Sequence, residues 1–188
     1  MPLYLQDALG LSALASGLIV MPGGLLMGLA GPLVGRWYDH LGPRPLVIPG
    51  AAGATLALAG MALWYTLGAE VWLIVVLYAV LCAGMALMFG PLFTAGMGSL
   101  AKDRYSYGSA MLGTIQQLAG AAGTAAIVVI YTVAGLGATR DGASPAASTA
   151  AGAHTAFLVC AIAFVVVIGL SVLVRRPSEE IPGAPVVH

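Results

Sequence analysis

The sequence predicts an all-α membrane protein with five transmembrane helices. Sixty per cent of its residues are hydrophobic and 7% are charged, whereas soluble domains carry about 25% charged residues. Long apolar runs alternate with short segments that hold nearly all the charges, and about 20 helical residues suffice to cross a bilayer core. The formal charge is zero and the basic residues form no stripe, so we expect the lipid bilayer, and no nucleic acid, as a partner.

The first helix is predicted over residues 14–34, and a charged turn follows it at 35–44. Residues 8–35 contain no Asp, Glu, Lys or Arg over 28 positions. Two arginines and one aspartate placed at mid-bilayer would cost about 8–10 kcal/mol on the insertion scale, so the chain must leave the membrane at the turn. We expect Pro22 to kink this helix. A row of glycines on one helix face should let another backbone approach closely: Gly17, Gly24, Gly28, Gly31 and Gly35.

The second and third helices are predicted over residues 46–67 and 72–97. The second has a small-residue face that includes Gly50 and Gly60. The third carries Met85 and Met88 on one face. Methionine is flexible and polarisable, which suits a wall that contacts apolar ligands of varied shape, but methionine also fills ordinary cores. Both interpretations, cavity lining and core filling, stay open for these two residues.

The fourth helix is predicted over residues 108–133, after a second charged turn at 102–107. It carries Thr114, Gln116 and Gln117 in an apolar surrounding. An amide in lipid is costly, so both glutamines should face protein or a water-filled cavity. One interpretation is an interhelical hydrogen bond, worth about 0.6 kcal/mol. The other is a polar contact with a transported substrate, and Thr114, Gln116 and Gln117 are therefore candidate cavity-lining residues.

The rest of the chain is predicted as an external loop, a fifth helix and a tail. Residues 135–152 are rich in Ala, Gly, Ser and Thr, which is typical of a mobile loop. The fifth helix should cover residues 155–174. Residues 1–176 then form one partial bundle, and residues 177–188 form a polar tail without a fold signal.

Several kinds of chemistry are not expected here. Cys82 and Cys160 each lie inside an apolar run, where small buried hydrophobes are more common than a disulfide or metal site. We find no nucleophile–base set, metal-ligand spacing or phosphate loop, so an enzyme, a cofactor and a metal site are not expected. The membrane-embedded part of the predicted helices contains no Asp, Glu, Lys or Arg, so a proton-coupling group would have to lie elsewhere.

Basic residues predict the orientation. With five helices, both charged turns and the C-terminus fall on one side of the membrane. Six of the seven Lys and Arg residues lie on that side, and Arg140 alone lies opposite. The positive-inside rule makes that side cytoplasmic, with the N-terminus outside.

The first charged turn resembles a loop pattern of the major facilitator superfamily. Gly35, Asp39, Gly42 and Arg44 fit G-x-x-x-D-R/K-x-G-R/K, with His40 where Arg or Lys is usual. Residues 2–32 look like the later half of the fourteen-helix drug:proton antiporter branch, in Pro2-Leu3-Tyr4-Leu5-Gln6, Gly17, Met21-Pro22 and Pro32. Residues 108–110 and 114–120 are similar to the G-S-A…T-x-R-Q-L-G segment of that branch, with Gln116 in place of Arg.

This resemblance, which covers residues 2–175, implies a fold and a function. The five helices would be the second to sixth of the C-terminal six-helix bundle of a bacterial plasma-membrane transporter. Such a transporter exports drugs or other small hydrophobic compounds by alternating access with proton antiport, and its N-terminal half would be the missing partner. Asp39 and Arg44 would latch its cytoplasmic side. Two alternatives stay open: a small helix-packing scaffold or assembly subunit, and an inactive gene fragment.

Overall fold

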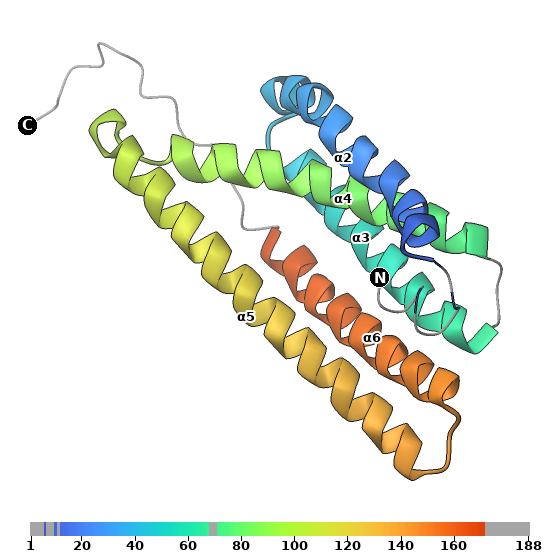
Figure 1. Cartoon of the computed structure of the whole chain (residues 1–188). Coiled ribbons are helices and arrows are strands. Elements are labelled where there is room, and N and C mark those ends of the chain that lie inside the picture. The colour runs from blue at the N-terminus through green and yellow to red at the C-terminus, as the bar shows by residue number, and fades with distance from the viewer. Residues whose placement is uncertain (1–5, 7–9, 11, 68–70, 172–188) are drawn as a thin grey trace, which may run out of the picture.

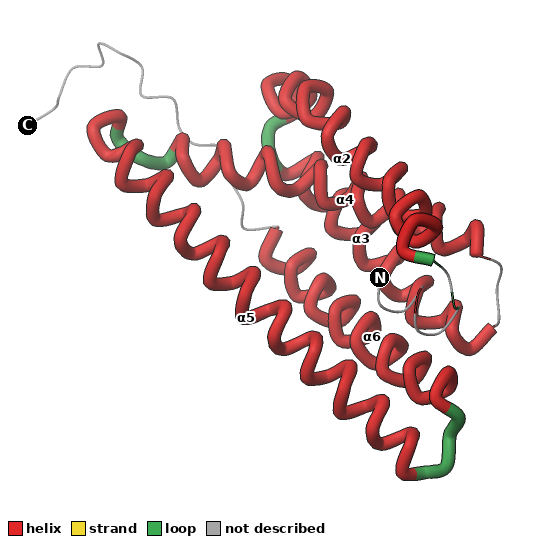
Figure 2. The backbone as a smooth tube through the Cα atoms, viewed as in Figure 1, coloured by secondary structure: helices red, strands yellow, loops and turns green. Residues whose placement is uncertain are grey.

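Five long helices make up the described part of the chain. The computed structural model describes residues 6, 10, 12–67 and 71–171, and no strand occurs among them (Figures 1 and 2). All five helices are long and apolar enough to cross a membrane. The predicted fold class is therefore confirmed. The predicted tail at 177–188 and the last residues of the predicted fifth helix lie outside the described residues.

Helix α2, Ala13–Leu41, runs further than the sequence suggested. Ser12 caps its start, since the Ser12 hydroxyl accepts a hydrogen bond from the Ala15 N–H (3.2 Å). The helix continues through Pro22 and onward through Asp39. At 1.5 Å per residue its 29 residues reach about 43 Å. This exceeds a hydrocarbon core of about 30 Å, so the charged final turns can stand outside the membrane while remaining helical.

Helix α3, Arg44–Leu67, begins after a very short turn. The Pro43 carbonyl accepts hydrogen bonds from Leu46 N–H (3.2 Å) and Val47 N–H (2.9 Å). Pro45 sits in the first turn of the helix, where its missing N–H has no intrahelical partner to lose. The predicted boundary at residue 46 was therefore two residues late.

Helix α4, Val71–Gly98, packs against α3 through facing glycines. A Cβ built on Gly50 would lie 2.8 Å from the Gly84 carbonyl oxygen, and one built on Gly84 would lie 2.5 Å from the Gly50 oxygen. Beside them Ala51, Ala54 and Ala57 of α3 are buried. The small-residue face predicted for the second helix, α3, is thus a helix-packing surface, as expected where small residues let backbones meet.

The predicted loop at residues 135–152 is wrong, because most of it is helical. A 3₁₀ turn, Lys102–Arg104, leads into α5, Tyr105–Arg140, and after four residues α6 covers Pro145–Ser171. Gly142 (φ 86°) ends the hairpin turn. The Ser144 hydroxyl then accepts a hydrogen bond from Ala147 N–H (3.3 Å), so Ser144-Pro145 starts α6 as an N-cap followed by proline.

The helices form an open arc in which each packs mainly on the next. The spatial order is α2, α4, α3, α6 and α5, and Figure 1 shows α2 and α5 at its two ends. Helix α5 contains no buried side chain. The two interior clusters lie within the arc, one around Ile74 and Ala153 and the other around Val47, Ala51 and Met88.

The glycine row of α2 does not pack within the described chain. A Cβ built on any of its five members would meet nothing within 4 Å. The contact with α4 uses Gly23 instead, against Tyr78 and Cys82. The close approach that the row predicts therefore has no partner among the residues that the structure describes.

Candidate functional site

The charged segment is mostly the end of a helix. Arg36, Asp39 and His40 lie in the last turns of α2 and are exposed. The turn itself is formed by Gly42 and Pro43, both buried. Gly42 adopts φ 79°, a left-handed value that glycine accepts without strain, and its N–H donates to the Tyr38 carbonyl (2.8 Å). Arg44, exposed, opens α3.

Asp39 lies at the wall of a groove between α2 and α4. The groove has a volume of about 390 Å³. From α2 it is lined by Gly35 and Asp39, which are one helical turn apart, and from α4 by Phe89 and Thr94. The remaining lining residues are Met27, Gly31, Val34, Tyr38, Ala86, Gly90 and Pro91. The structure thus brings Gly35 and Asp39 together on one wall, while Gly42 and Arg44 shape the turn next to it.

The residues of α4 in this groove could not be assigned from the sequence. Thr94 has no pattern that marks it, and its position opposite Asp39 depends on how α4 packs on α2. Phe89 is 43% exposed. The sequence signal nearby is Gly90-Pro91. Both residues are small, so they leave space on the α4 surface where it lines the groove.

The two candidate methionines occupy different places. Met88 is 6% exposed and packs with Val47 and Ala51 of α3 and with Phe164 of α6. Met85 is half-buried. Among the described residues, then, Met88 fills the core of the arc, and Met85 has surface left for another contact.

The three candidate polar residues of α5, Thr114, Gln116 and Gln117, are exposed. The Thr114 hydroxyl donates to the Ala110 carbonyl of its own helix (2.9 Å). No hydrogen bond joins the side-chain amide of Gln116 or Gln117 to another residue that the structure describes. The five candidate cavity-lining residues are therefore not gathered into one closed site in this chain.

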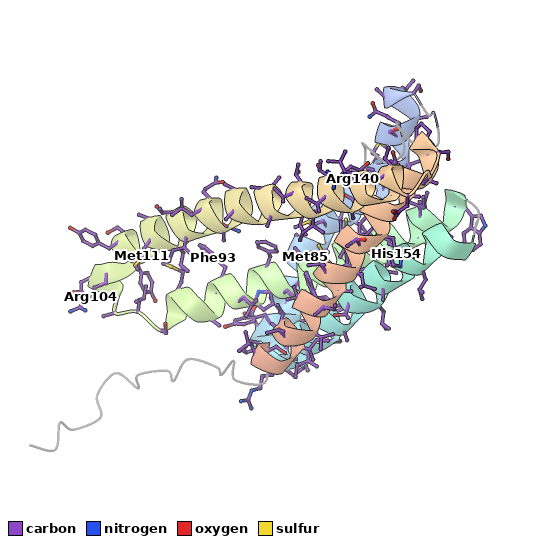
Figure 3. The ribbon with its side chains drawn as sticks, turned by 90° about the horizontal axis from the view of Figure 1, so that it is seen from below. Met85, Phe93, Arg104, Met111, Arg140 and His154 are labelled. Carbon is purple, nitrogen blue, oxygen red and sulfur yellow. The ribbon has the colours of Figure 1, made fainter. Side chains whose placement is uncertain are left out.

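Apolar side chains occupy the space between α4 and α5. Figure 3 shows Phe93 of α4 and Met111 of α5 in the gap between the two helices, close to their connecting turn. Phe93 is 49% exposed and Met111 is 66% exposed. Arg104 and Arg140 mark the two ends of α5 in the same view. Within the described ranges, no group of three or more His, Cys, Asp or Glu residues could hold a metal ion.

Comparison with known proteins identifies the family. The model of the Major Facilitator Superfamily matches residues 1–124. The chain belongs to the Major Facilitator Superfamily. It is therefore a multi-pass membrane protein of a transporter family, not an enzyme. No solved structure matches it.

Relatives in this superfamily are bacterial proteins, several of them named for drug resistance. The lincomycin resistance protein LmrB of Listeria monocytogenes is 38% identical over 182 residues, which are 94% of this chain and 38% of that protein. LmrB of Bacillus subtilis is 36% identical over 90% of this chain and 36% of its own length. The multidrug resistance protein B homolog of Mycobacterium tuberculosis is 32% identical over 70% of this chain and 25% of its own length. The chain thus spans less than two fifths of these relatives.

Proposed function

We propose that this chain is the C-terminal part of a major facilitator transporter that exports drugs or other small hydrophobic compounds. The observation that carries the proposal is the match to the Listeria lincomycin resistance protein over 94% of this chain. Transport would follow alternating access, in which two helix bundles rock around a site near the membrane midplane. Proton antiport would supply the driving force through ionisable groups on the remaining helices, because the embedded segments here have none.

Asp39 and Arg44 act in this proposal as a latch on the cytoplasmic side. Asp39 lies on the groove wall between α2 and α4, within one helical turn of the α2–α3 connection. A carboxylate there can form charge-assisted hydrogen bonds in one transport state and release them in the other. Gly35 leaves the groove wall without a side chain, and Gly42 permits the sharp turn.

Met85, Thr114 and Gln117 are the residues that we retain as cavity lining. Each keeps exposed surface in the chain, and their neutral thioether, hydroxyl and amide groups suit uncharged parts of a hydrophobic substrate. Met88 fills the core and could contact substrate only if α3 or α6 moved. For Gln116 we favour an interhelical hydrogen bond over contact with substrate.

Orientation in the membrane is the last part of the proposal. The α2–α3 turn and the 3₁₀ turn at Lys102–Arg104 lie on one side, and of the Lys and Arg residues that the structure describes only Arg140 lies on the other. The positive-inside rule makes this side cytoplasmic in a bacterial plasma membrane.

The test is drug accumulation in a bacterium that lacks its own exporters. Cells that express the complete gene, with its upstream helices, should accumulate less of a lipophilic cationic dye or of lincomycin than cells with an empty vector. Asp39→Asn should lower export about tenfold and so return accumulation nearly to the empty-vector level, while membrane abundance stays normal, since the amide removes the charge but little volume. Unchanged accumulation with the complete gene would contradict the proposal, and loss of the Asp39→Asn protein would assign Asp39 to folding.

A scaffold function remains the second candidate. The observation that favours it is the unpacked glycine row of α2, since such a face serves assembly as well as transport. If the product of the complete gene stabilised a partner complex but did not change the accumulation of dye or lincomycin, the scaffold function would be favoured.

A further inference from the structure

The first half of α2 carries a hollow on its exposed side. The hollow has a volume of about 470 Å³ and is lined by Ser16, Gly17, Val20, Met21, Gly24 and Leu25. Two of these residues lack side chains, and a Cβ built on either glycine would meet nothing within 4 Å. Helix α2 lies at one end of the arc (Figure 1). The described part of the chain therefore leaves this hollow open.

Ser16 is the one polar side chain among these lining residues, and its hydroxyl lacks a partner. The side chain is 1% exposed, yet no hydrogen bond joins its hydroxyl to another residue that the structure describes. Ser16 lies two helical turns before Gly23, which packs on Tyr78 of α4. It is therefore placed at the edge of the hollow beside α4. Buried polar groups nearly always have a hydrogen-bond partner, so this hydroxyl requires an explanation.

The other two buried serines show that the Ser16 hydroxyl is unusual. The Ser148 hydroxyl accepts a hydrogen bond from the Thr139 hydroxyl (2.9 Å), and the Ser171 hydroxyl donates to the Ile168 carbonyl of its own helix (2.7 Å). A serine within a helix can turn its hydroxyl back to a carbonyl three or four residues earlier. Ser16 makes no such bond, so its hydroxyl is available to a molecule that enters the hollow.

A small molecule suits this hollow better than another helix does. Ligand pockets measure about 300–1,000 Å³ and are mostly apolar, with a few polar groups that fix orientation. The hollow ends at Leu25, whereas the glycine row of α2 continues to Gly35, so it does not follow the row as a groove for a helix would. A transmembrane helix also satisfies its backbone groups internally, and its backbone would leave the Ser16 hydroxyl unpaired.

We propose that this hollow, the α2 subsite, binds the apolar part of an exported compound while Ser16 forms a hydrogen bond with a polar group on that compound. The ligand class is a small hydrophobic compound that carries an amine, hydroxyl or carbonyl group. The inference rests on the proposed function and deepens it. Ser16 would let the transporter distinguish hydrophobic compounds by their hydrogen-bonding groups, a difference that an apolar wall alone recognises weakly.

The first test compares the export of two lipophilic cations by the complete protein in cells that lack other exporters. Ethidium carries amino groups that can donate to a hydroxyl, whereas tetraphenylphosphonium has no hydrogen-bonding group. Ser16→Ala should lower ethidium export about fivefold, the effect of losing one hydrogen bond, and should leave tetraphenylphosphonium export unchanged. Equal loss of export for both cations would refute the hydrogen bond.

Gly24→Leu fills the subsite, and Gly28→Leu is its matched control. Both glycines belong to the same row on α2, but Gly28 lies outside the subsite. Gly24→Leu should lower the export of both cations about tenfold, because leucine occupies the volume that the apolar part of each would fill. Gly28→Leu should leave export unchanged. Equal loss with the two variants would show that a helix packs along the whole row, and would refute the subsite.

A labelling measurement tests binding without transport. Met21 lies in the subsite and is 53% exposed, whereas Leu29 of the same helix lies outside it and is 78% exposed. The complete protein, with its native cysteines replaced by alanine, is labelled in membranes with a maleimide. Ethidium should slow the labelling of Met21→Cys and not that of Leu29→Cys. Labelling of Met21→Cys at the same rate with and without ethidium would refute the subsite.

The outcomes distinguish the subsite from the proposed function. Ethidium export that neither Ser16→Ala nor Gly24→Leu lowers refutes the subsite and leaves the proposed function standing. If the unmodified protein exports neither cation nor lincomycin, the proposed function is refuted, and the Met21→Cys labelling then decides whether the subsite binds the dye. If Ser16→Ala lowers the amount of protein in the membrane, the Gly24→Leu and Met21→Cys results decide for or against the subsite.

Discussion

Glycine has two different roles in this protein, and only the neighbouring helix distinguishes them. Gly84 lies under the α3 backbone, where a Cβ would come within 2.5 Å of the Gly50 oxygen and 3.0 Å of the Ala54 nitrogen. Gly28 lies on α2 with open space around it. Both are mid-helix glycines in apolar runs, so the sequence alone does not indicate which of the two is packed against another helix.

Gly84→Ala should therefore destabilise the chain, whereas Gly28→Ala should not. The extra methyl group at Gly84 meets backbone atoms that cannot move aside, an overpacking that typically costs about 1–3 kcal/mol. At Gly28 the methyl group meets nothing, and alanine is the better helix former. The midpoint of thermal unfolding in detergent measures both. Equal midpoints for the two variants would show that α3 and α4 do not approach as described.

At the scale of elements, close backbone packing stabilises the α5–α6 hairpin more than its interhelical hydrogen bond does. The Thr139–Ser148 bond joins two side chains near the end of the hairpin. Gly152, by contrast, lets the α6 backbone lie directly against Tyr131. Interhelical hydrogen bonds in membranes contribute only about 0.6 kcal/mol on average, so close packing should dominate.

We expect Gly152→Leu to separate α5 from α6 and Thr139→Val to leave them together. A leucine at residue 152 would clash with the Tyr131 carbonyl, whereas valine at residue 139 loses the one weak bond between the helices, together with the bond to the Gly135 carbonyl within α5, and keeps the volume. Spin labels on one exposed residue of each helix, with their distance measured in liposomes, would report the separation. A larger distance with Thr139→Val than with Gly152→Leu would reverse this ranking.

At the scale of the whole molecule, the proposed orientation predicts which turns are accessible from outside the cell. Ser144 lies in the α5–α6 turn and Ser99 in the turn after α4, and both are exposed. An impermeant thiol reagent should label Ser144→Cys in intact cells and Ser99→Cys only after lysis, because the basic residues gather on the Ser99 side. The parent chain with Cys82 and Cys160 replaced by alanine is the control. Labelling in the opposite order would invert the topology.

The isolated chain should not carry out proton-driven transport. Alternating access needs two bundles around a shared site, and the described residues form an open arc whose end helix α5 buries no side chain. Proton coupling also needs a titratable group within the membrane. Liposomes that contain the purified chain should therefore take up a lipophilic cationic dye under a pH gradient no faster than empty liposomes. Uptake that an uncoupler abolishes would show that the chain assembles a complete pathway.

The sequence by itself determined the class, the helix number and the family. Long uncharged runs can be satisfied in lipid only as helices, because every backbone group must then bond within its own segment. Because this requirement concerns each segment separately, it can be applied to the sequence without knowing the tertiary structure. Residues 35–44 were predicted as a turn, and only the structure extends α2 through Gly35 and Asp39 and has them one helical turn apart on one groove wall.

Helix ends were less well predicted, although local signals were present. The start of α6 at Ser144-Pro145 is an ordinary N-cap followed by proline. Low complexity in the surrounding residues pointed to a loop, but alanine-rich segments are also strong helix formers. The predicted start of this helix at residue 155 is therefore ten residues late.

Only the tertiary structure decided which faces meet. The arc order α2, α4, α3, α6, α5 differs from the chain order, so Thr94 reaches the groove beside Asp39 and Met88 enters the core with Phe164. In a membrane the lipid is as apolar as the side chains, so hydrophobicity does not indicate which face of a helix is buried. Close packing of small residues decides it instead, and that packing depends on the shape of a neighbour far away in the sequence, as Gly84 is from Gly50.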